Sequence, residues 1–177
     1  MMQMPKNIKK IWDTVTSVLV ALVVIFAVFL MGSRLMGLQV YNVISASMEP
    51  TYSVGDLLYV KAVDPDSVKV GDPITFVLNE DLLVATHRVV KIDSENRRFT
   101  TKGDANETED AAPVHFNNLI GVPVFSIPLL GYISAYIQSP PGMYVAIGLG
   151  ALLIAAVFLP DMITKETKKK TTEEETK

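Results

Sequence analysis

The sequence contains no cysteine and only two histidines, His87 and His115. The absence of cysteine excludes disulfides, thiol nucleophiles and cysteine-based zinc sites. Two histidines are too few for a histidine-rich metal site, so we expect neither a metal nor another cofactor. The 16 basic and 19 acidic side chains give a net charge of −3, without the positive excess that is typical of nucleic-acid-binding proteins. Any chemistry must come from hydroxyls, carboxylates, lysines and the two imidazoles.

Two long apolar runs account for much of the 49 % hydrophobic content. Residues 14–33 carry no charge, and residues 142–159 form a second run that Pro160 closes. A helix needs about 20 apolar residues to cross a bilayer, so the sequence predicts transmembrane helices over residues 14–33 and 140–160. The first run is longer than the ~7–15 apolar residues of a cleavable signal peptide, which favours an uncleaved anchor.

Lysines lie before the first run and after the second, towards the two ends of the chain. These lysines are Lys6, Lys9, Lys10, Lys165, Lys168, Lys169 and Lys170. No lysine lies close to the inner end of either run. The positive-inside rule therefore predicts a cytoplasmic N-terminus over residues 1–13 and a cytoplasmic tail over residues 161–177. Residues 34–139 are then extracytoplasmic. The tail is charged and low in complexity, and we expect it to be disordered.

The central segment has the pattern of β structure. Short runs rich in Val, Ile, Leu, Tyr and Phe alternate with Gly, Pro and Asp turn signals, at residues 38–44, 56–63, 73–78, 82–92, 97–103 and 119–125. No sustained helical period occurs outside the two apolar runs. We expect antiparallel sheets that form a small sandwich or barrel. Residues 121–137 are predicted to be a last strand followed by a segment at the membrane interface, or else a strand buried in the core.

Two groups in this segment could support nucleophilic chemistry. Ser45 and Ser47 lie in the sequence Ser-Ala-Ser-Met-Glu-Pro after an apolar strand, where serines by themselves indicate a polar turn. His87 lies in a strand whose alternation places it on one face with Val89 and Lys91. An imidazole there is either a general base or a partly buried structural histidine.

Carboxylates follow in the stretch Lys-Gly-Asp-Ala-Asn of residues 102–106 and in Glu107, Glu109 and Asp110. A Gly-Asp turn among acidic residues is normally a solvated loop. The serines, the histidine and these carboxylates are each a weak signal alone. Their order along the chain is what makes them informative.

The order Ser-x-Ser-Met-x-Pro (residues 45–50), His-Arg (87–88) and Lys-Gly-Asp-x-Asn (102–106), after an N-terminal anchor, resembles the type I signal peptidase family, S26. The resemblance implies a mainly β extracytoplasmic catalytic domain of the signal-peptidase/LexA-like fold, built of antiparallel sheets. An N-terminal and a C-terminal transmembrane helix would flank it. Histidine at residue 87, where common bacterial enzymes have lysine, is similar to the archaeal and endoplasmic-reticulum branch.

The resemblance also implies roles for individual residues. Ser47 would be the nucleophile, His87 the general base and Asp110 the acid that orients the imidazole, with Asp104 supporting the site. The hydroxyl of Ser45 would join the backbone N–H of Ser47 in the oxyanion hole. The family usually has asparagine directly after the motif aspartate, whereas this chain has Ala105.

The implied function is that of a membrane-bound serine endopeptidase that removes signal peptides from exported precursor proteins. Its partners would be these precursors, the lipid bilayer and the protein-export channel, and not nucleic acid. We expect a two-pass protein of the plasma membrane, or alternatively of the endoplasmic reticulum membrane. The other hypotheses are a catalytically silent membrane subunit that binds precursors and a Ser/Lys-dyad peptidase with Lys91 or Lys102 as base.

The predicted topology can be tested with single cysteines, since the natural chain has none. Ser67→Cys should react with an impermeant maleimide from outside intact cells or vesicles, and Thr172→Cys only after the membrane is opened. Labelling of both positions from the same side would show that one apolar run does not cross the bilayer. The second run is then suspected first, because a helix over residues 142–159, with a rise of about 1.5 Å per residue, only just covers a ~30 Å hydrocarbon core.

Overall fold

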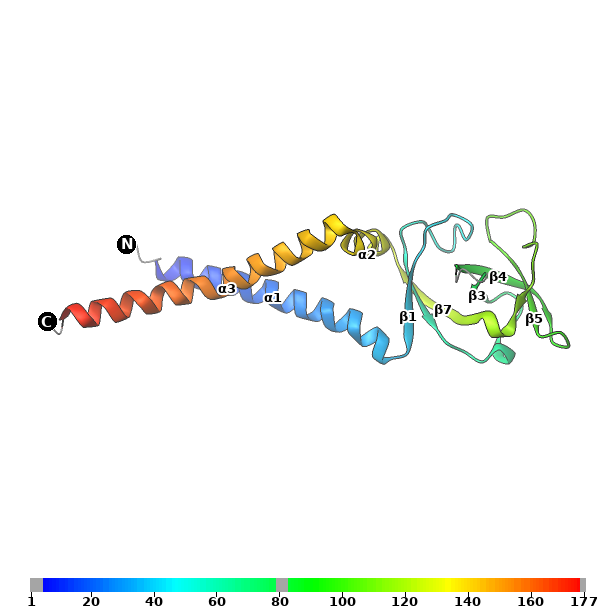
Figure 1. Ribbon diagram of the computed structural model, residues 1–177, viewed down its shortest axis with the longest axis horizontal. Helices are drawn as coiled ribbons and strands as arrows, with labels where there is room; N and C mark the ends of the chain where they lie inside the picture. Colours follow the sequence, from blue (N-terminus) through cyan, green and yellow to red (C-terminus); the bar gives the residue numbers. More distant parts are fainter. Residues whose placement is uncertain (1–4, 79–82, 176–177) are drawn as a thin grey trace. The chain divides into compact units, whose positions relative to one another are not determined.

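The computed structural model describes residues 5–78 and 83–175 (Figure 1). The chain divides into two compact units, one of Met1–Met31 with Ser139–Lys177 and one of Gly32–Gln138. The first unit contains α3 (Pro140–Glu175) and most of α1 (Lys6–Leu35), whose last turn, from Gly32 on, falls in the second unit. The second, called the β unit below, contains the strands and the short helix α2 (Leu130–Gln138).

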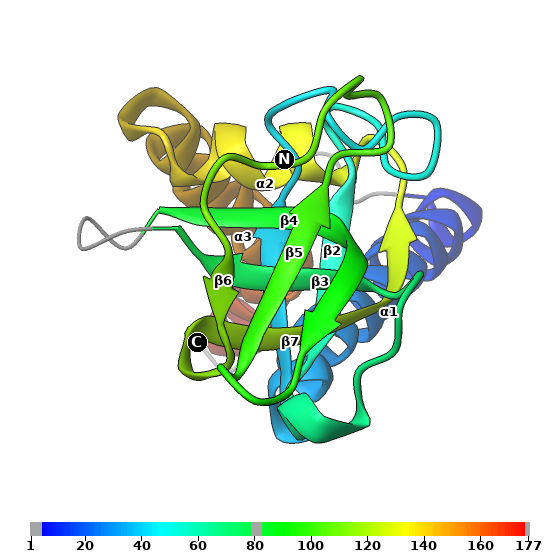
Figure 2. The ribbon, with the colours of Figure 1, turned by 90° about the vertical axis from the view of Figure 1, so that its right-hand side faces the viewer.

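Seven strands make up the β unit. They are β1 (Leu38–Asn42), β2 (Leu57–Lys61), β3 (Pro73–Val77), β4 (Val84–Asp93), β5 (Arg98–Lys102), β6 (Val114–His115) and β7 (Leu119–Ile127). Their order is β1-β2-β7-β3-β4-β5-β6, and every neighbouring pair is antiparallel. The mainly β, antiparallel fold that the sequence predicts is therefore confirmed, as a half-barrel sheet. Figure 2 looks onto the end of the β unit where β3 to β6 lie.

The last long strand, β7, joins the two halves of the sheet. Its first residues pair with β3, at Leu119 and Gly121, and its later part, from Val122 to Ile127, pairs with β2. Gly121 lies where the chain of β2 approaches closely, since a Cβ atom there would be 2.1 Å from the carbonyl oxygen of Lys61. A residue with any side chain would push the two halves apart at this point.

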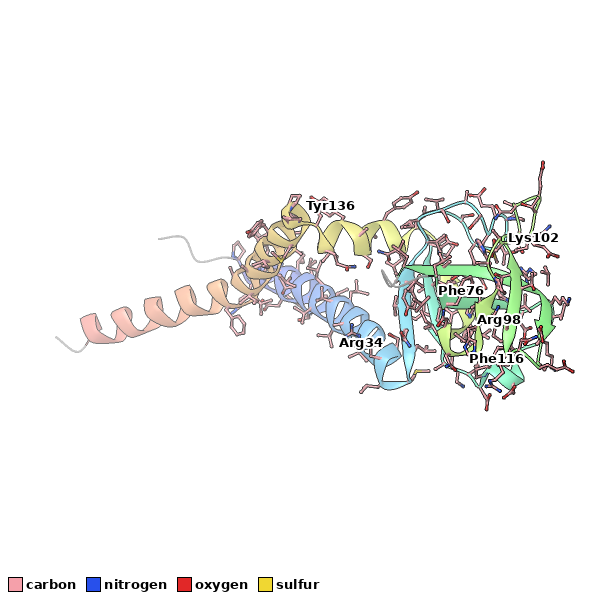
Figure 3. The ribbon with its side chains drawn as sticks, turned by 45° about the vertical axis from the view of Figure 1, so that its right-hand side comes forward. Arg34, Phe76, Arg98, Lys102, Phe116 and Tyr136 are labelled. Carbon is pink, nitrogen blue, oxygen red and sulfur yellow. The ribbon has the colours of Figure 1, made fainter. Side chains whose placement is uncertain are left out.

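Two groups of buried side chains form the core. The larger lies among β3 to β6 and contains Val68, Ile74, Phe76, Val89, Phe99, Val114 and Phe116. The rings of Phe99 and Phe116 stack with their centroids 4.3 Å apart, and Phe76 and Phe116 are labelled in Figure 3. The smaller group contains Leu38, Leu57 and Tyr59, from β1 and β2.

The six predicted strands correspond to β1 to β5 and β7. The two-residue β6 and the helix α2 were not predicted. The alternative of a buried strand over residues 121–137 is wrong in its second half, because α2 is helical and exposes Tyr132, Ile133 and Tyr136 by more than half. A nine-residue helix is too short to show the sustained period on which the prediction relied.

The two predicted flanking helices differ in how far the structure supports them as spans. Within the described residues, one helix is long and apolar enough to cross a membrane, at Pro140–Phe158, with a mean hydropathy of 2.0. The first span, over residues 14–33, lies inside α1 and stays a prediction. Gly37, with φ of 72°, follows the end of α1 and donates its N–H to the carbonyl of Arg34.

The C-terminal prediction needs a correction. Helix α3 continues through Pro160 to Glu175, so the helix does not end at Pro160 and residues 161–175 form helix instead of a disordered tail. Proline fixes a backbone angle that suits a helix and removes one hydrogen bond, which neighbouring groups can replace. The sequence beyond it also spaces Glu166 and Lys170 four residues apart, an arrangement that favours a helix.

Candidate active site

Ser47 lies on a loop between β1 and β2, residues 43–56, which is called the Ser47 loop below. The loop closes at its neck, where Val43 donates to the carbonyl of Asp56 and Gly55 donates to that of Val43, both at 2.9 Å. Met48, directly after Ser47, is 3 % exposed. A buried side chain next to Ser47 anchors the loop, because its burial would be lost if the loop moved.

A second loop holds the backbone of Ser47 from the other side. It links β5 to β6 over residues 103–113 and is called the acidic loop below. Ala105 donates its N–H to the carbonyl of Ser47 at 2.9 Å, and a Cβ atom on Gly103 would be 2.6 Å from the same oxygen. Only glycine at residue 103 leaves room for this carbonyl, so the Lys-Gly-Asp sequence fits directly against the Ser47 loop.

Three side chains from distant parts of the sequence form one line of polar contacts. The Nε2 atom of His87 lies 3.1 Å from the Oγ of Ser47, and its Nδ1 lies 2.6 Å from the Oδ2 of Asp110. His87 comes from β4 and Asp110 from the acidic loop. The side chains of His87 and Asp110 are 16 % and 23 % exposed, so these contacts are largely but not fully shielded from solvent. The structure thus brings together three of the residues that the sequence singled out.

The position of His87 follows from the strand pairing. His87 lies opposite Ile74 of β3, and its ring meets the edge of Phe76 with centroids 6.3 Å apart and planes at 69°. Both partners belong to the larger core group. One side of the imidazole therefore packs on the core while its two nitrogens contact Ser47 and Asp110.

Asp110 has a second hydrogen-bond donor in Thr101 of β5. The Oγ1 of Thr101 lies 2.7 Å from the same Oδ2 that contacts His87, and the N–H of Asp110 donates to the carbonyl of Thr101 at 2.8 Å. Sequence reasoning missed Thr101. A signal for it existed, since Thr101 falls on the same alternating face as the core residue Phe99, where a hydroxyl needs a partner.

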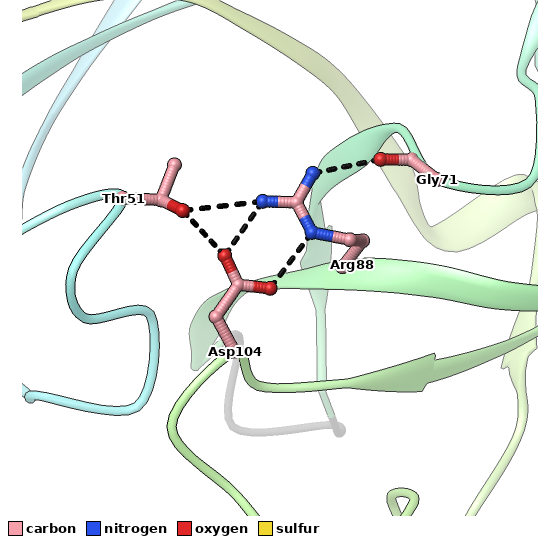
Figure 4. A network of polar contacts seen from close by, with 4 residues as sticks. All are labelled: Thr51, Gly71, Arg88 and Asp104. Atoms are coloured by element: carbon pink, nitrogen blue, oxygen red, sulfur yellow. Dashed lines mark hydrogen bonds and ion pairs between the residues drawn. The ribbon is translucent and has the colours of Figure 1, made fainter.

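Asp104 forms hydrogen bonds with Arg88, the residue after His87 (Figure 4). Its Oδ1 accepts the Nε–H of Arg88 at 2.7 Å, and its Oδ2 accepts another N–H of the guanidinium at 2.6 Å. The hydroxyl of Thr51 donates to Oδ2 at 2.6 Å, and Arg88 also donates to the carbonyl of Gly71 at 2.7 Å. This cluster, the Arg88 cluster, ties the Ser47 loop and the acidic loop to β4.

The charges of the Arg88 cluster reinforce one another. The hydrogen bond from Arg88 lowers the pKa of the Asp104 carboxyl below its ordinary value, and the Thr51 hydroxyl adds to this effect against the cost of burial. The same hydrogen bond raises the pKa of the Arg88 guanidinium. Both groups therefore stay charged, and a bidentate pair of this kind is stronger than a neutral hydrogen bond.

Ser45 and Ser47 lie close to each other on their loop. The two Oγ atoms are 3.3 Å apart, and the side chain of Ser45 is exposed. The hydroxyl of Ser45 therefore lies within reach of the hydroxyl of Ser47 and is accessible to solvent.

The two lysines of the alternative hypothesis do not lie beside Ser47. The pairing of β4 with β5 shifts between Val89 and Lys91, so the alternation that placed Lys91 on the face of His87 is wrong. After the shift, Ile92 packs against the core and Lys91 is exposed. Lys102 lies opposite Arg88, on the other face from His87.

Glu109, the neighbour of Asp110, is exposed and points to solvent. Within the described part of the chain, no three His, Asp or Glu side chains are grouped so that they could hold a metal ion.

Comparison with known proteins places the chain among signal peptidases. The catalytic subunit sec11 of the signal peptidase complex of Schizosaccharomyces pombe is 32 % identical over 141 residues, which cover 63 % of this chain and 75 % of that protein. The chain belongs to the type I signal peptidase family. Signal peptidase I W of Bacillus subtilis is 40 % identical over 86 residues, and the human catalytic subunit SEC11C is 37 % identical over 71 residues.

These last two matches cover only 45 % and 37 % of the relatives' own lengths. No family model matches the chain. The resemblance to the type I signal peptidase family S26 is confirmed, on the branch of the SEC11 subunits.

The Arg88 cluster predicts an acid-sensitive stability term. The pKa of Asp104 is lowered in the folded state, so the Arg88–Asp104 pair stabilises the fold fully at a pH above 3.8, the ordinary pKa of an aspartate. This contribution is lost as the pH falls through the pKa of the folded state. Asp104→Asn should cost roughly 1.5–3 kcal/mol near neutral pH, and the cost should shrink below about pH 3.8.

The measurement is a thermal melt of the full chain in detergent at several pH values. The control is Asp66→Asn, whose exposed pair with Arg97 at 3.6 Å should contribute little at any pH. A difference in Tm between wild type and Asp104→Asn that stays constant from neutral to acid pH would contradict the role of the charge.

Proposed function

We propose that the chain is a membrane-bound serine endopeptidase that removes signal peptides from exported precursor proteins. The observation that carries the proposal is the line from the Ser47 hydroxyl through the two nitrogens of His87 to Asp110, at 3.1 and 2.6 Å. Family membership supports the choice of substrate, since the relatives are named for signal peptide processing.

The proposed first step is attack by Ser47 on the carbonyl carbon of the scissile peptide bond. A serine hydroxyl is a weak nucleophile until a base removes its proton, and Nε2 of His87 lies within reach of that proton. Asp110 accepts the Nδ1–H of His87, which keeps Nε2 free as the acceptor and stabilises the imidazolium that forms. His87 then gives the proton to the leaving amine, and the C–N bond breaks.

The second step returns the enzyme to its starting state. Water attacks the acyl-enzyme ester, His87 takes a proton from that water, and the Ser47 oxygen leaves and regains a proton from His87. In both steps negative charge develops on the carbonyl oxygen of the substrate. The backbone N–H of Ser47 and the exposed hydroxyl of Ser45 would donate to this oxygen, and losing one such donor typically costs about 10²–10³ in turnover.

The Arg88 cluster supports the site without contact with the reacting atoms. It connects the loop that carries Ser47, through Thr51, with the loop that carries Asp110, through Asp104. We assign Asp104 this structural role and Asp110 the orienting role.

The proposed location is a membrane crossed twice, with both termini in the cytoplasm and the β unit outside. Helix α3 supplies one span, at Pro140–Phe158. The first span, residues 14–33, would lie within α1. The plasma membrane is the first choice and the endoplasmic reticulum membrane the alternative. Precursors, the bilayer and the export channel are the proposed partners.

Cleavage of a model precursor by the purified full chain in detergent tests the function. Ser47→Ala and His87→Ala should each lower turnover by about 10⁴–10⁶-fold, as expected for a nucleophile and its base. Lys91→Ala and Lys102→Ala should leave turnover within a few-fold of wild type. A severe loss in a lysine variant, together with an active His87→Ala, would support the Ser/Lys dyad, and a folded but inactive wild type would support the silent subunit.

The choice of orienting acid has its own matched pair of variants. Asp110→Asn should lower turnover by about 10⁴-fold, because an amide favours the wrong tautomer of the imidazole. Glu109→Gln makes the same chemical change on the exposed neighbour and should be nearly silent. Normal turnover of Asp110→Asn would remove Asp110 from the mechanism.

A further inference from the structure

The buried hydroxyl of Thr101 takes part in no step described above, yet it contacts the proposed acid. Thr101 is 0 % exposed, and its Oγ1 lies 2.7 Å from the Oδ2 of Asp110. This oxygen also lies 2.6 Å from the Nδ1 of His87. One carboxylate oxygen thus has two donors, one from the proposed base and one from the sheet.

The strand register explains why Thr101 reaches this position. Thr101 lies opposite Val89, two residues after His87 on β4, so Thr101 and His87 are diagonal neighbours on one face. The carbonyl of Thr101 also accepts the N–H of Asp110 at 2.8 Å. Asp110 is therefore held at its backbone and at its side chain by the same residue of a regular strand.

We infer that Thr101 is a positioning residue that orients the Asp110 carboxylate toward His87. This inference rests on the proposed function. A carboxylate on a loop can rotate about its side-chain bonds, and most orientations present neither oxygen to Nδ1. A hydroxyl fixed in a strand removes that freedom before the substrate arrives, as pre-organised sites require.

The test compares Thr101→Val, which keeps the size and removes the donor, with Thr101→Ser, which keeps the donor. Thr101→Val should lower kcat by about 10–100-fold with little change in KM, as expected for a lost hydrogen bond to a charged group. Thr101→Ser should recover most of kcat. Thr75→Val is the matched control, because Thr75 is also 0 % exposed and its hydroxyl contacts Thr86 on the other face of the sheet at 2.8 Å.

The outcomes separate this inference from the proposed function. Wild-type kcat in Thr101→Val, with Ser47→Ala inactive, would overturn the role of Thr101 and leave the function intact. An equal loss in Thr101→Val and Thr75→Val would show a general packing effect and would also overturn it. Undiminished cleavage by Ser47→Ala would instead overturn the function itself.

A separate observation concerns the two long helices. Pro160 lies within α3 and has no N–H, so the carbonyl of Ala156, four residues earlier, lacks its usual donor within the helix. The indole N–H of Trp12, from α1, donates to this carbonyl at 3.0 Å. Trp12 is the single tryptophan of the chain.

The geometry points to Trp12 as a residue that stabilises the pairing of α1 with α3, because its indole N–H bonds the Ala156 carbonyl that Pro160 leaves without a donor. A neighbouring helix can supply the missing donor, which is one of the ways by which proline is tolerated in membrane helices. Tryptophan also favours the boundary between hydrocarbon and water, and Trp12 and Pro160 stand next to the proposed cytoplasmic ends of the two spans.

A double-mutant cycle in the full chain in detergent tests this pairing. Asp13→Cys and Val157→Cys, next to the contacting residues, allow a flexible bismaleimide to report how often the helices are paired. Trp12→Phe should lower the ratio of paired to unpaired chains roughly fivefold. In the Pro160→Ala background, where residue 160 supplies its own N–H, Trp12→Phe should have no further effect. An equal effect in both backgrounds, or none in either, would overturn this role of Trp12.

Discussion

The pairing of β7 with both β2 and β3 is the constraint on which the geometry of the site depends. Ser47 lies on the loop between β1 and β2, in one half of the sheet, whereas His87 and Thr101 belong to the half that starts with β3. In the order of the strands, β7 is the element between them. A hydrogen bond of 3.1 Å between the two halves tolerates little movement, so the close packing of Gly121 against the Lys61 carbonyl bears directly on the proposed chemistry.

Loop contacts then complete what the sheet begins. The carbonyl of Ser47 fits against Gly103 and Ala105, and Thr51 joins the Arg88–Asp104 pair. These contacts connect the two halves of the sheet that β7 also joins, and on the Ser47 loop they are made by Ser47 itself and by Thr51. The proposed nucleophile is thus fixed at its own backbone and a few residues beyond it, while its side chain remains free to react.

The sequence was sufficient for the strands and for singling out three side chains that the fold brings into contact, Ser47, His87 and Asp110. It was insufficient for features that depend on how the strands pair. The alternation of apolar and polar residues within β4 is a property of that strand alone, and it predicts the strand correctly. The shift between Val89 and Lys91 depends on β5, which alternation in one strand cannot reveal, and it moved Lys91 to the other face. For the same reason, Asp104 could not be assigned to Arg88 instead of His87 before the loops were placed. Trp12, the donor to the Ala156 carbonyl, lies 144 positions away from it in the sequence, far beyond any local pattern.

The acidic loop has one further consequence, which concerns changes of chain length. Its start is fixed by Gly103 and Ala105 against Ser47, and Asp110 is fixed by Thr101. Between these two attachments, residues 106–109 are exposed. Lengthening a loop costs little free energy when both of its ends are held, since the cost grows only with the logarithm of its length. Extra residues inserted after Glu107 would therefore bulge into solvent, so this short stretch is where the chain can accept an insertion, an affinity tag or a fluorescent label without moving Ser47 or Asp110.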